Sequence, residues 1–140
     1  MARRPAPLEP VQVVQNACVV RDLERACHRL HALYRIGPFL RSRPRPITDA
    51  RYRGEPVREP IVLATAFGQA GSVNIELIQP LSAGPNIYDD VVPPGCDGFH
   101  HVATWSSDYP AEKQAYLDAG FETASSTSVR ILPPYVDHHC

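Results

Sequence analysis

The amino-acid sequence predicts a small α+β domain made of two related halves. A β-rich run leads into an amphipathic helix near residue 11, and a second strand and helix begin near residue 99. Between them lie β-rich runs that are joined by a short glycine-containing link. Hydrophobic residues make up 44% of the 140-residue chain and charged residues 21%, which is typical of one globular domain.

The first half opens with a strand and a helix. Residues 1–10 are rich in proline and arginine and show no periodicity, so we expect a flexible arm. The run VQVVQNACVV predicts a strand, and DLERACHRLHALY predicts a helix. Asp22 is placed to cap this helix, and Gly37 with Pro38 to end it. Its apolar residues recur at helical spacing and are Leu23, Cys27, Leu30 and Tyr34.

Three further strands complete the first half, which we place at residues 11–80. FLRSRPRPITDARYRG contains prolines and alternates only weakly. PIVLATAF and SVNIELIQ are stronger strand candidates, and the link GQAG predicts a hairpin between them. Residues 81–98 contain three prolines and three glycines, which predicts a long linking loop.

The second half, residues 99–135, repeats the strand and the helix. FHHVATW predicts a strand, and AEKQAYLDAG predicts a helix with Asp108 at its cap, Pro110 in its first turn and Gly120 at its end. FETAS and VRILPPYV are short β-like runs, and residues 136–140 form a tail. We expect residues 11–140 to form a single domain.

Charge and composition exclude several function classes. A net charge of -1 argues against nucleic-acid binding, because phosphate contacts need an excess of Lys and Arg. No apolar stretch approaches the roughly 18 residues that span a bilayer, so we expect no membrane role. The four cysteines form no CxxC pair and the chain start lacks the apolar run of a signal peptide, which predicts a cytoplasmic protein with free thiols.

Arginines gather in one segment of the first half. They are Arg35, Arg41, Arg43, Arg45, Arg51, Arg53 and Arg58. Such a charge run is most often a solvated face or edge strand. The alternative is a grip on a phosphate or carboxylate through bidentate contacts.

An internal repeat links the two strand-helix units. The segment from Gln15 to Asp22 lies over the segment from His101 to Asp108. Each has a polar residue at the strand start, Ala two residues later and a capping Asp seven residues later. Gln15 and His101 are therefore expected to face the same way in two copies of one motif, with Trp105 packed in the core at the position matched by Val19.

The segments QNACVVRDLERA, NIELIQPLSAGP and GFHHVATWSSDY resemble the glyoxalase and methylmalonyl-CoA epimerase branch of the vicinal oxygen chelate superfamily, over roughly residues 11–135. The resemblance implies paired βαβββ modules that form a half-open barrel. In a departure from that pattern, the second module is expected to lack its last strand. The resemblance also implies a divalent metal ion inside the barrel. A homodimer is expected, because a partner subunit could cover the sheet edge that is left open.

The resemblance places the metal ligands on Gln15, Glu76 and His101. Gln15 stands where the family usually has a histidine, and an amide is a poorer ligand, so we expect a weaker site or a harder ion. The family's fourth ligand, a glutamate of the last strand, has no counterpart in this chain. Gln15 is alternatively a hydrogen-bond donor to substrate.

Other residues are candidates for the site, and each also has a possible structural role. Alternation puts Asn74 and Glu76 on one face, and an inward carboxylate is costly unless it is paired or bound, so Glu76 is a candidate catalytic residue and Asn74 a substrate contact. Glu59 could act as a general base, although a surface role is the simpler interpretation. Tyr88 is a candidate contact from the loop.

The remaining histidines are expected to be structural or solvated. Strand alternation turns His100 to the face opposite His101. His28 and His31 lie among arginines on the polar side of the helix, where solvent exposure is expected. The terminal cluster of His138, His139 and Cys140 resembles a metal-binding tail but carries little weight at a chain end.

The sequence favours a small-molecule enzyme, although it leaves the reaction open. The leading hypothesis is a metal-assisted isomerase, epimerase or lyase that acts on a carbonyl or carboxylate compound. The alternative is a pocket that binds or sequesters a small molecule without catalysis, as bleomycin-resistance relatives do. A structural or regulatory module without a ligand is a third possibility.

Overall fold

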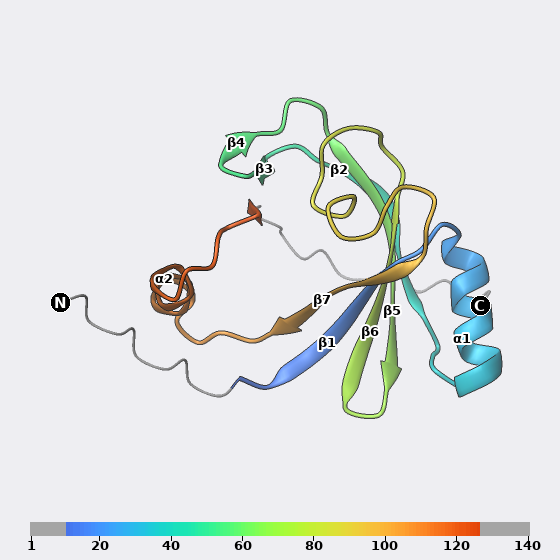
Figure 1. Cartoon of the computed structure of the whole chain (residues 1–140). Helices are drawn as coiled ribbons and strands as arrows, with labels where there is room; N and C mark the ends of the chain where they lie inside the picture. Colours follow the sequence, from blue (N-terminus) through green and yellow to red (C-terminus); the bar gives the residue numbers. More distant parts are fainter. Residues whose placement is uncertain (1–10, 127–140) are drawn as a thin grey trace.

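The computed structural model describes residues 11–126 of the chain (Figure 1). The predicted arm at residues 1–10, the run VRILPPYV and the tail with His138, His139 and Cys140 lie outside the described residues. Within the described part, the chain forms a five-stranded mixed sheet, a small three-stranded sheet and two helices. The α+β class predicted from the sequence is confirmed.

The main sheet carries the strands of the first half and one strand of the second. Its order is β2 (Leu40–Ile47), β5 (Ile61–Ala70), β6 (Val73–Pro80), β1 (Val13–Val19) and β7 (Gly98–Thr104). β1 runs parallel to β6 and antiparallel to β7, so the first strands of the two halves lie side by side. The first half therefore has the βαβββ arrangement implied by the family resemblance.

The first helix, α1 (Leu23–Tyr34), begins as expected but ends differently. The Asp22 carboxylate accepts a hydrogen bond from the backbone N–H of Arg25 at 2.9 Å, which caps the helix. At the other end, Arg35 adopts a left-handed conformation with φ 59°, and its N–H donates to the carbonyl of His31 at 2.9 Å. The prediction that Gly37 ends the helix was wrong, because Arg35 takes the left-handed position two residues earlier.

One core lies between α1 and the main sheet. Its buried members are Val20, Leu23, Cys27, Phe39, Ala66 and Leu77. α1 packs on β5 and β6 through this cluster, on one side of the sheet (Figure 1). Tyr34 was expected to join the apolar stripe, but it is exposed because the helix ends there beyond the edge of the cluster. His28 and His31 are exposed, as predicted.

Gly68 explains why β5 is longer than the sequence suggested. The link GQAG was expected to form the turn, but Gly68 pairs with Ile75 inside the ladder. A Cβ atom at Gly68 would lie 2.6 Å from Cε1 of Phe39, so the position has room only for glycine. The turn itself is Gly71 and Ser72, with Gly71 at φ 61°, a conformation that glycine adopts without strain.

The small sheet and the linking loop stand above the other face of the main sheet. The small sheet consists of β4 (Glu55–Pro56), β3 (Arg51–Tyr52) and β8 (Ser125–Ser126). Asp90 connects the loop to the small sheet. Its carboxylate accepts one hydrogen bond from the hydroxyl of Tyr52 at 2.7 Å and another from Nη2 of Arg53 at 3.3 Å. One of the clustered arginines, Arg53, therefore has a structural partner.

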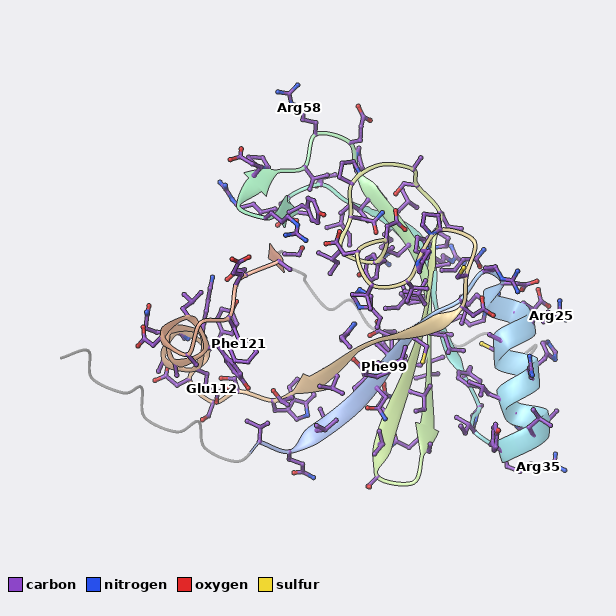
Figure 2. The ribbon with its side chains drawn as sticks, in the orientation of Figure 1. Arg25, Arg35, Arg58, Phe99, Glu112 and Phe121 are labelled. Atoms are coloured by element: carbon purple, nitrogen blue, oxygen red, sulfur yellow. The ribbon has the colours of Figure 1, made fainter. Side chains whose placement is uncertain are left out.

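The second half is only partly packed against the first. Its helix α2 (Tyr109–Asp118) is capped by Asp108, which accepts from the N–H of Ala111 at 3.1 Å. Among residues 11–126, no element packs against α2, and Figures 1 and 2 show it away from the main sheet. Phe121 lies beside α2 in Figure 2. Trp105 was expected in the core but is 81% exposed, because β7 ends at Thr104 and leaves it beyond the sheet. The half-open barrel stays a prediction.

Neither described helix has the length and apolar character needed to cross a membrane.

Candidate functional site

A second buried cluster marks the face of the main sheet that lies under the loop and the small sheet. Its members are Ala17, Ala50, Ile61, Leu63 and Ile78, with Tyr88 of the loop packed against them. Residues paired across the ladders share one face, so this face also holds the residues that pair with Ala17. We call this surface the loop-side face.

Glu76 and His101 meet on the loop-side face across Ala17. Ala17 of β1 pairs with Glu76 of β6 on one side and with His101 of β7 on the other. The Oε2 atom of Glu76 lies 3.7 Å from Nε2 of His101, although two strand spacings of about 4.8 Å separate their backbones. Because Ala17 carries only a methyl group, the two longer side chains reach each other above it.

The surroundings of this pair favour uncharged side chains. Burial raises the pKa of Glu76 to about 7, because the charged carboxylate loses hydration. Burial, and then the charge of His100, lower the pKa of His101. Burial and the charge of Glu76 raise the pKa of Tyr88 to about 12, which places Tyr88 within electrostatic reach of Glu76. A carboxyl group with a pKa near neutrality can both accept and return a proton.

His100 also belongs to this face, against the prediction from strand alternation. Ala17 pairs with His101 but Cys18 pairs with Phe99, so His100 is an extra residue in β7 and forms a β-bulge. The bulge brings Nδ1 of His100 to 2.7 Å from Nδ1 of His101. The two imidazoles therefore contact each other, and the sequence assignment of His100 to the opposite face was wrong.

The linking loop contacts the second ring nitrogen of His100. Nε2 of His100 lies 2.9 Å from the carbonyl oxygen of Ile87, and its ring lies 5.0 Å from the ring of Tyr88. The loop backbone is fixed here by Asn86, whose side-chain oxygen accepts from the N–H groups of Tyr88 and Asp89 at 2.9 and 3.1 Å. Tyr88, a predicted substrate contact, thus stands over the site on an ordered turn.

Gln15 and Asn74 continue the same face toward the hairpin end. They are register partners on β1 and β6, and Nε2 of Gln15 donates to Oδ1 of Asn74 at 2.9 Å. Nδ2 of Asn74 in turn donates to the carbonyl of Gly68 at 3.3 Å. Both amides line a cavity of about 450 Å³ that Trp105 also borders, whereas Glu76, His101 and Tyr88 do not line it. A cavity of this volume accommodates a small organic ligand.

The donor set of this face suits a weakly held divalent cation. Glu76 offers a carboxylate, His101 an imidazole nitrogen, and Gln15 the amide oxygen that its bond to Asn74 leaves free. Within residues 11–126, no three His, Cys, Asp or Glu side chains are grouped as ligands, so a third side-chain donor would be an amide. An amide oxygen suits a harder ion better than a borderline one.

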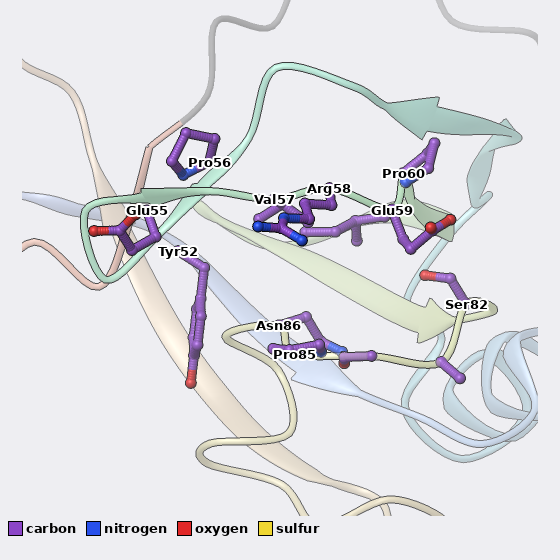
Figure 3. Close-up of a pocket in the computed structure, with 13 residues that line it drawn as sticks. Tyr52, Glu55, Pro56, Val57, Arg58, Glu59, Pro60, Ser82, Pro85 and Asn86 are labelled. Atoms are coloured by element: carbon purple, nitrogen blue, oxygen red, sulfur yellow. The ribbon is translucent and has the colours of Figure 1, made fainter.

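Glu59 lies elsewhere. It is exposed and lines a separate cavity of about 350 Å³ between the small sheet and the loop, shown in Figure 3. The walls of that cavity include Pro56, Pro60 and Pro85, while neither Glu76 nor His101 lines it. The structure therefore does not bring Glu59 together with the other candidate residues.

Sequence reasoning missed two residues of the site, His100 and Asn86. The run of two histidines in GFHHVATW was visible, but nothing in the sequence indicated a bulge that turns both toward one face. Asn86 was visible only as part of a loop, yet it is 4% exposed and organises the turn below Tyr88. An asparagine next to a glycine and a proline is a typical signal of such a turn.

Comparison with known proteins identifies the family of this chain. No curated protein matches the sequence. The family model described as the glyoxalase/bleomycin resistance protein/dioxygenase superfamily matches residues 14–131, which include all of β1 but its first residue, β6 and β7, with all the candidate residues of the loop-side face. The resemblance to vicinal oxygen chelate proteins is thereby confirmed, and the chain belongs to the glyoxalase/bleomycin resistance protein/dioxygenase superfamily.

Proposed function

We propose that this chain is a small-molecule enzyme, an isomerase, epimerase or lyase that moves a proton next to a carbonyl or carboxylate group. Glu76 takes and returns the proton, and His101 lies beside it. Tyr88, Gln15 and Asn74 contact the substrate. The observation that carries the proposal is the approach of Glu76 to His101 at 3.7 Å on a largely buried face.

The environment of Glu76 supports this role. Its side chain is 16% exposed, so substrate can reach it while bulk water is mostly excluded. The pKa of about 7 means that neither protonation state dominates at neutral pH. A general base works best when its pKa lies near the working pH, because proton uptake and return are then both fast. Burying a carboxylate lowers the stability of the fold, and a catalytic role would account for that cost.

A divalent ion, where bound, would be held by His101, Glu76 and the amide oxygen of Gln15, and would supply positive charge to a developing enolate oxygen; Glu76 would act as the base only where it does not ligate the ion. The side chains themselves contribute orientation. The amides of Gln15 and Asn74 can hydrogen-bond a substrate oxygen, since each bears both a donor and an acceptor. Tyr88 offers an apolar ring and a hydroxyl from above.

Deuterium exchange at an acidic carbon tests the proposal. The full chain is incubated in D₂O, with and without Mn²⁺, with a panel of 2-oxo acids, 2-hydroxy ketones and acyl thioesters. The loss of the C–H signal is followed by ¹H NMR. In this exchange Glu76 takes the proton, the electron pair passes into the carbonyl as an enolate, and the same carbon is then deuterated. We expect exchange with at least one compound class and a loss of about 100-fold in Glu76→Gln.

A matched control separates this loss from unfolding. Glu122→Gln changes the same charge at an exposed position outside the site and should keep the wild-type rate. Equal rates in the wild type and in Glu76→Gln would overturn the role of Glu76. No exchange with any of these classes would overturn the proposed reaction.

The donor set favours one alternative, a binding protein without catalysis. Gln15 replaces an imidazole and is already hydrogen-bonded to Asn74, which leaves two strong ligands on this face among the described residues. Such a protein would bind apolar small molecules in a metal-free state, and binding would survive Glu76→Gln. Calorimetric titration of the wild type and of Glu76→Gln, with the compounds of the same panel and with apolar small molecules, distinguishes the two functions.

A further inference from the structure

The contacts of His100 define the positions of two protons. A backbone carbonyl oxygen can only accept a hydrogen bond, so Nε2 of His100, at 2.9 Å from the carbonyl of Ile87, must carry the proton. In a neutral imidazole the other nitrogen then has a lone pair. Nδ1 of His100 is therefore an acceptor.

The position of the proton on His101 follows from its contact with His100. Its Nδ1 lies 2.7 Å from Nδ1 of His100, a distance that requires one donor and one acceptor. Since His100 accepts, His101 donates, and neutral His101 carries its proton on Nδ1. Its lone pair then lies on Nε2, 3.7 Å from Oε2 of Glu76, where it faces the carboxyl group favourably when Glu76 carries a proton. The opposite tautomer would set two lone pairs against each other at 2.7 Å.

We propose that His100 is a positioning residue that holds neutral His101 in the Nδ1–H tautomer, so that Nε2 presents its lone pair to Glu76 and to any ligand bound between them. The inference deepens the proposed function and rests on it for its catalytic meaning. The hydrogen-bond chain from Ile87 through His100 to His101 carries it.

Packing fixes His100 in the orientation that this role needs. The bulge in β7 turns its ring toward the loop, where the ring of Tyr88 lies 5.0 Å away at an interplanar angle of 38°. The His101 ring stands edge-on to it at 86°. The Ile87 carbonyl is held by the turn that Asn86 organises. An outer residue that orients a reacting or ligating histidine commonly changes ligand affinity 10- to 100-fold when it is replaced.

Nitrogen NMR of the intact chain tests the tautomer directly. ¹⁵N-labelled histidine side chains are assigned with His100→Gln and His101→Gln, in metal-free protein at a pH where imidazoles are neutral. We expect a protonated Nδ1 and an unprotonated Nε2 in His101, and the reverse in His100. A His101 ring protonated on Nε2 in the wild-type protein would overturn the proposal.

Two variants of His100 separate positioning from simple support of the fold. His100→Phe keeps a ring beside Tyr88 but removes both hydrogen bonds, so His101 should become a tautomer mixture and Zn²⁺ should bind about 10-fold or more weakly. His100→Gln retains a donor and an acceptor and should restore both readouts in large part. His28→Phe, on the exposed side of α1, is the control and should leave both unchanged.

The outcomes also separate this inference from the proposed function. Wild-type tautomer and Zn²⁺ affinity in His100→Phe would contradict the positioning role, whatever the activity. The predicted tautomer in a protein that exchanges no carbon-bound proton would uphold the role of His100 and count against the proposed reaction alone.

Discussion

Nε2 of His101 lies 3.7 Å from the carboxylate of Glu76, although the strands that carry these residues do not touch. The strand between them presents Ala17, whose methyl group leaves the space through which the two side chains approach. The site therefore depends on one small residue as much as on the two polar ones. It also depends on the pairing of the first strands of both halves, since His101 comes from the second.

Glu76→Gln should make the protein more stable at alkaline pH. Below about pH 7 the folded protein keeps the Glu76 proton, whereas the unfolded chain releases it above about pH 4.5. The folded state thus binds more protons in this window, and the free energy of unfolding falls as pH rises from 4.5 to 7. Removal of the charge should recover on the order of 2 to 3 kcal/mol at pH 8 and little at pH 4.5.

Urea unfolding of Glu76→Gln, Glu122→Gln and the wild type at several pH values checks this expectation. Glu122 is exposed, so its variant should follow the wild-type pH dependence. Parallel curves for Glu76→Gln and the wild type would show that Glu76 is solvated and contradict the burial on which its role rests.

Ala17→Val should fill the space between Glu76 and His101. Ala17 is fully buried, so the added methyl groups should cost about 1 to 3 kcal/mol and block ligand entry between the two side chains. Ala66→Val is the matched control, because Ala66 is equally buried but lies in the cluster under α1. Both variants should lose stability in urea, and only Ala17→Val should lose Zn²⁺ binding by calorimetry. Equal binding losses in both would argue against a site at Ala17.

Gly68→Ala should destabilise the fold through Phe39. The new Cβ atom would lie 2.6 Å from the phenyl ring, and overpacking of this kind costs about 1 to 3 kcal/mol. In the background of Phe39→Leu the same substitution should cost much less, because the ring is gone. A double-mutant cycle from urea unfolding measures this coupling. Additive effects would mean that Gly68 is required for backbone reasons and not for the ring.

A homodimer is expected at the β7 edge. The other edge strand, β2, contains Pro44 and Pro46, which lack an N–H and disfavour pairing. In the described part of the chain, β7 is the opposite edge of the main sheet, and Val102 on it is 49% exposed. Sedimentation velocity at micromolar concentration should show a dimer for the wild type and a monomer for Val102→Lys.

A surface control tests the specificity of this effect. Leu33 on α1 is also exposed, and Leu33→Lys should leave the dimer intact. The fluorescence of Trp105, the single tryptophan, should shift on dilution if the dimer covers this part of the molecule. A monomeric wild-type protein, or equal effects of the two lysine variants, would refute a dimer at β7.

Much of the fold followed from local patterns. Helical spacing and the capping residues Asp22 and Asp108 located both helices, and the β-rich runs located β1, β5, β6 and β7. The prediction that Glu76 and His101 converge came from the family resemblance, and their approach at 3.7 Å agrees with it. Strand alternation alone gave their faces but not the strand order that brings them together.

The features that local patterns missed arise from contacts between distant segments. His100 faces the site because β7 bulges against β1, and register is a property of the pair of strands. The strand position 68 is occupied by glycine because Phe39, 29 residues earlier in the chain, leaves no room for a side chain. Trp105 followed the repeat in sequence but not in packing, since β7 ends before it. Such effects require the tertiary structure.

Carbon NMR of the Glu76 side chain tests the central claim most directly. The carboxyl carbon, labelled with ¹³C and assigned by its loss in Glu76→Gln, is followed through a pH titration of the metal-free chain. A buried carboxyl group beside neutral His101 should titrate with a pKa of about 7. A midpoint near 4.5, the ordinary value for a solvated glutamate, would contradict the account, because Glu76 would then face bulk water instead of the site.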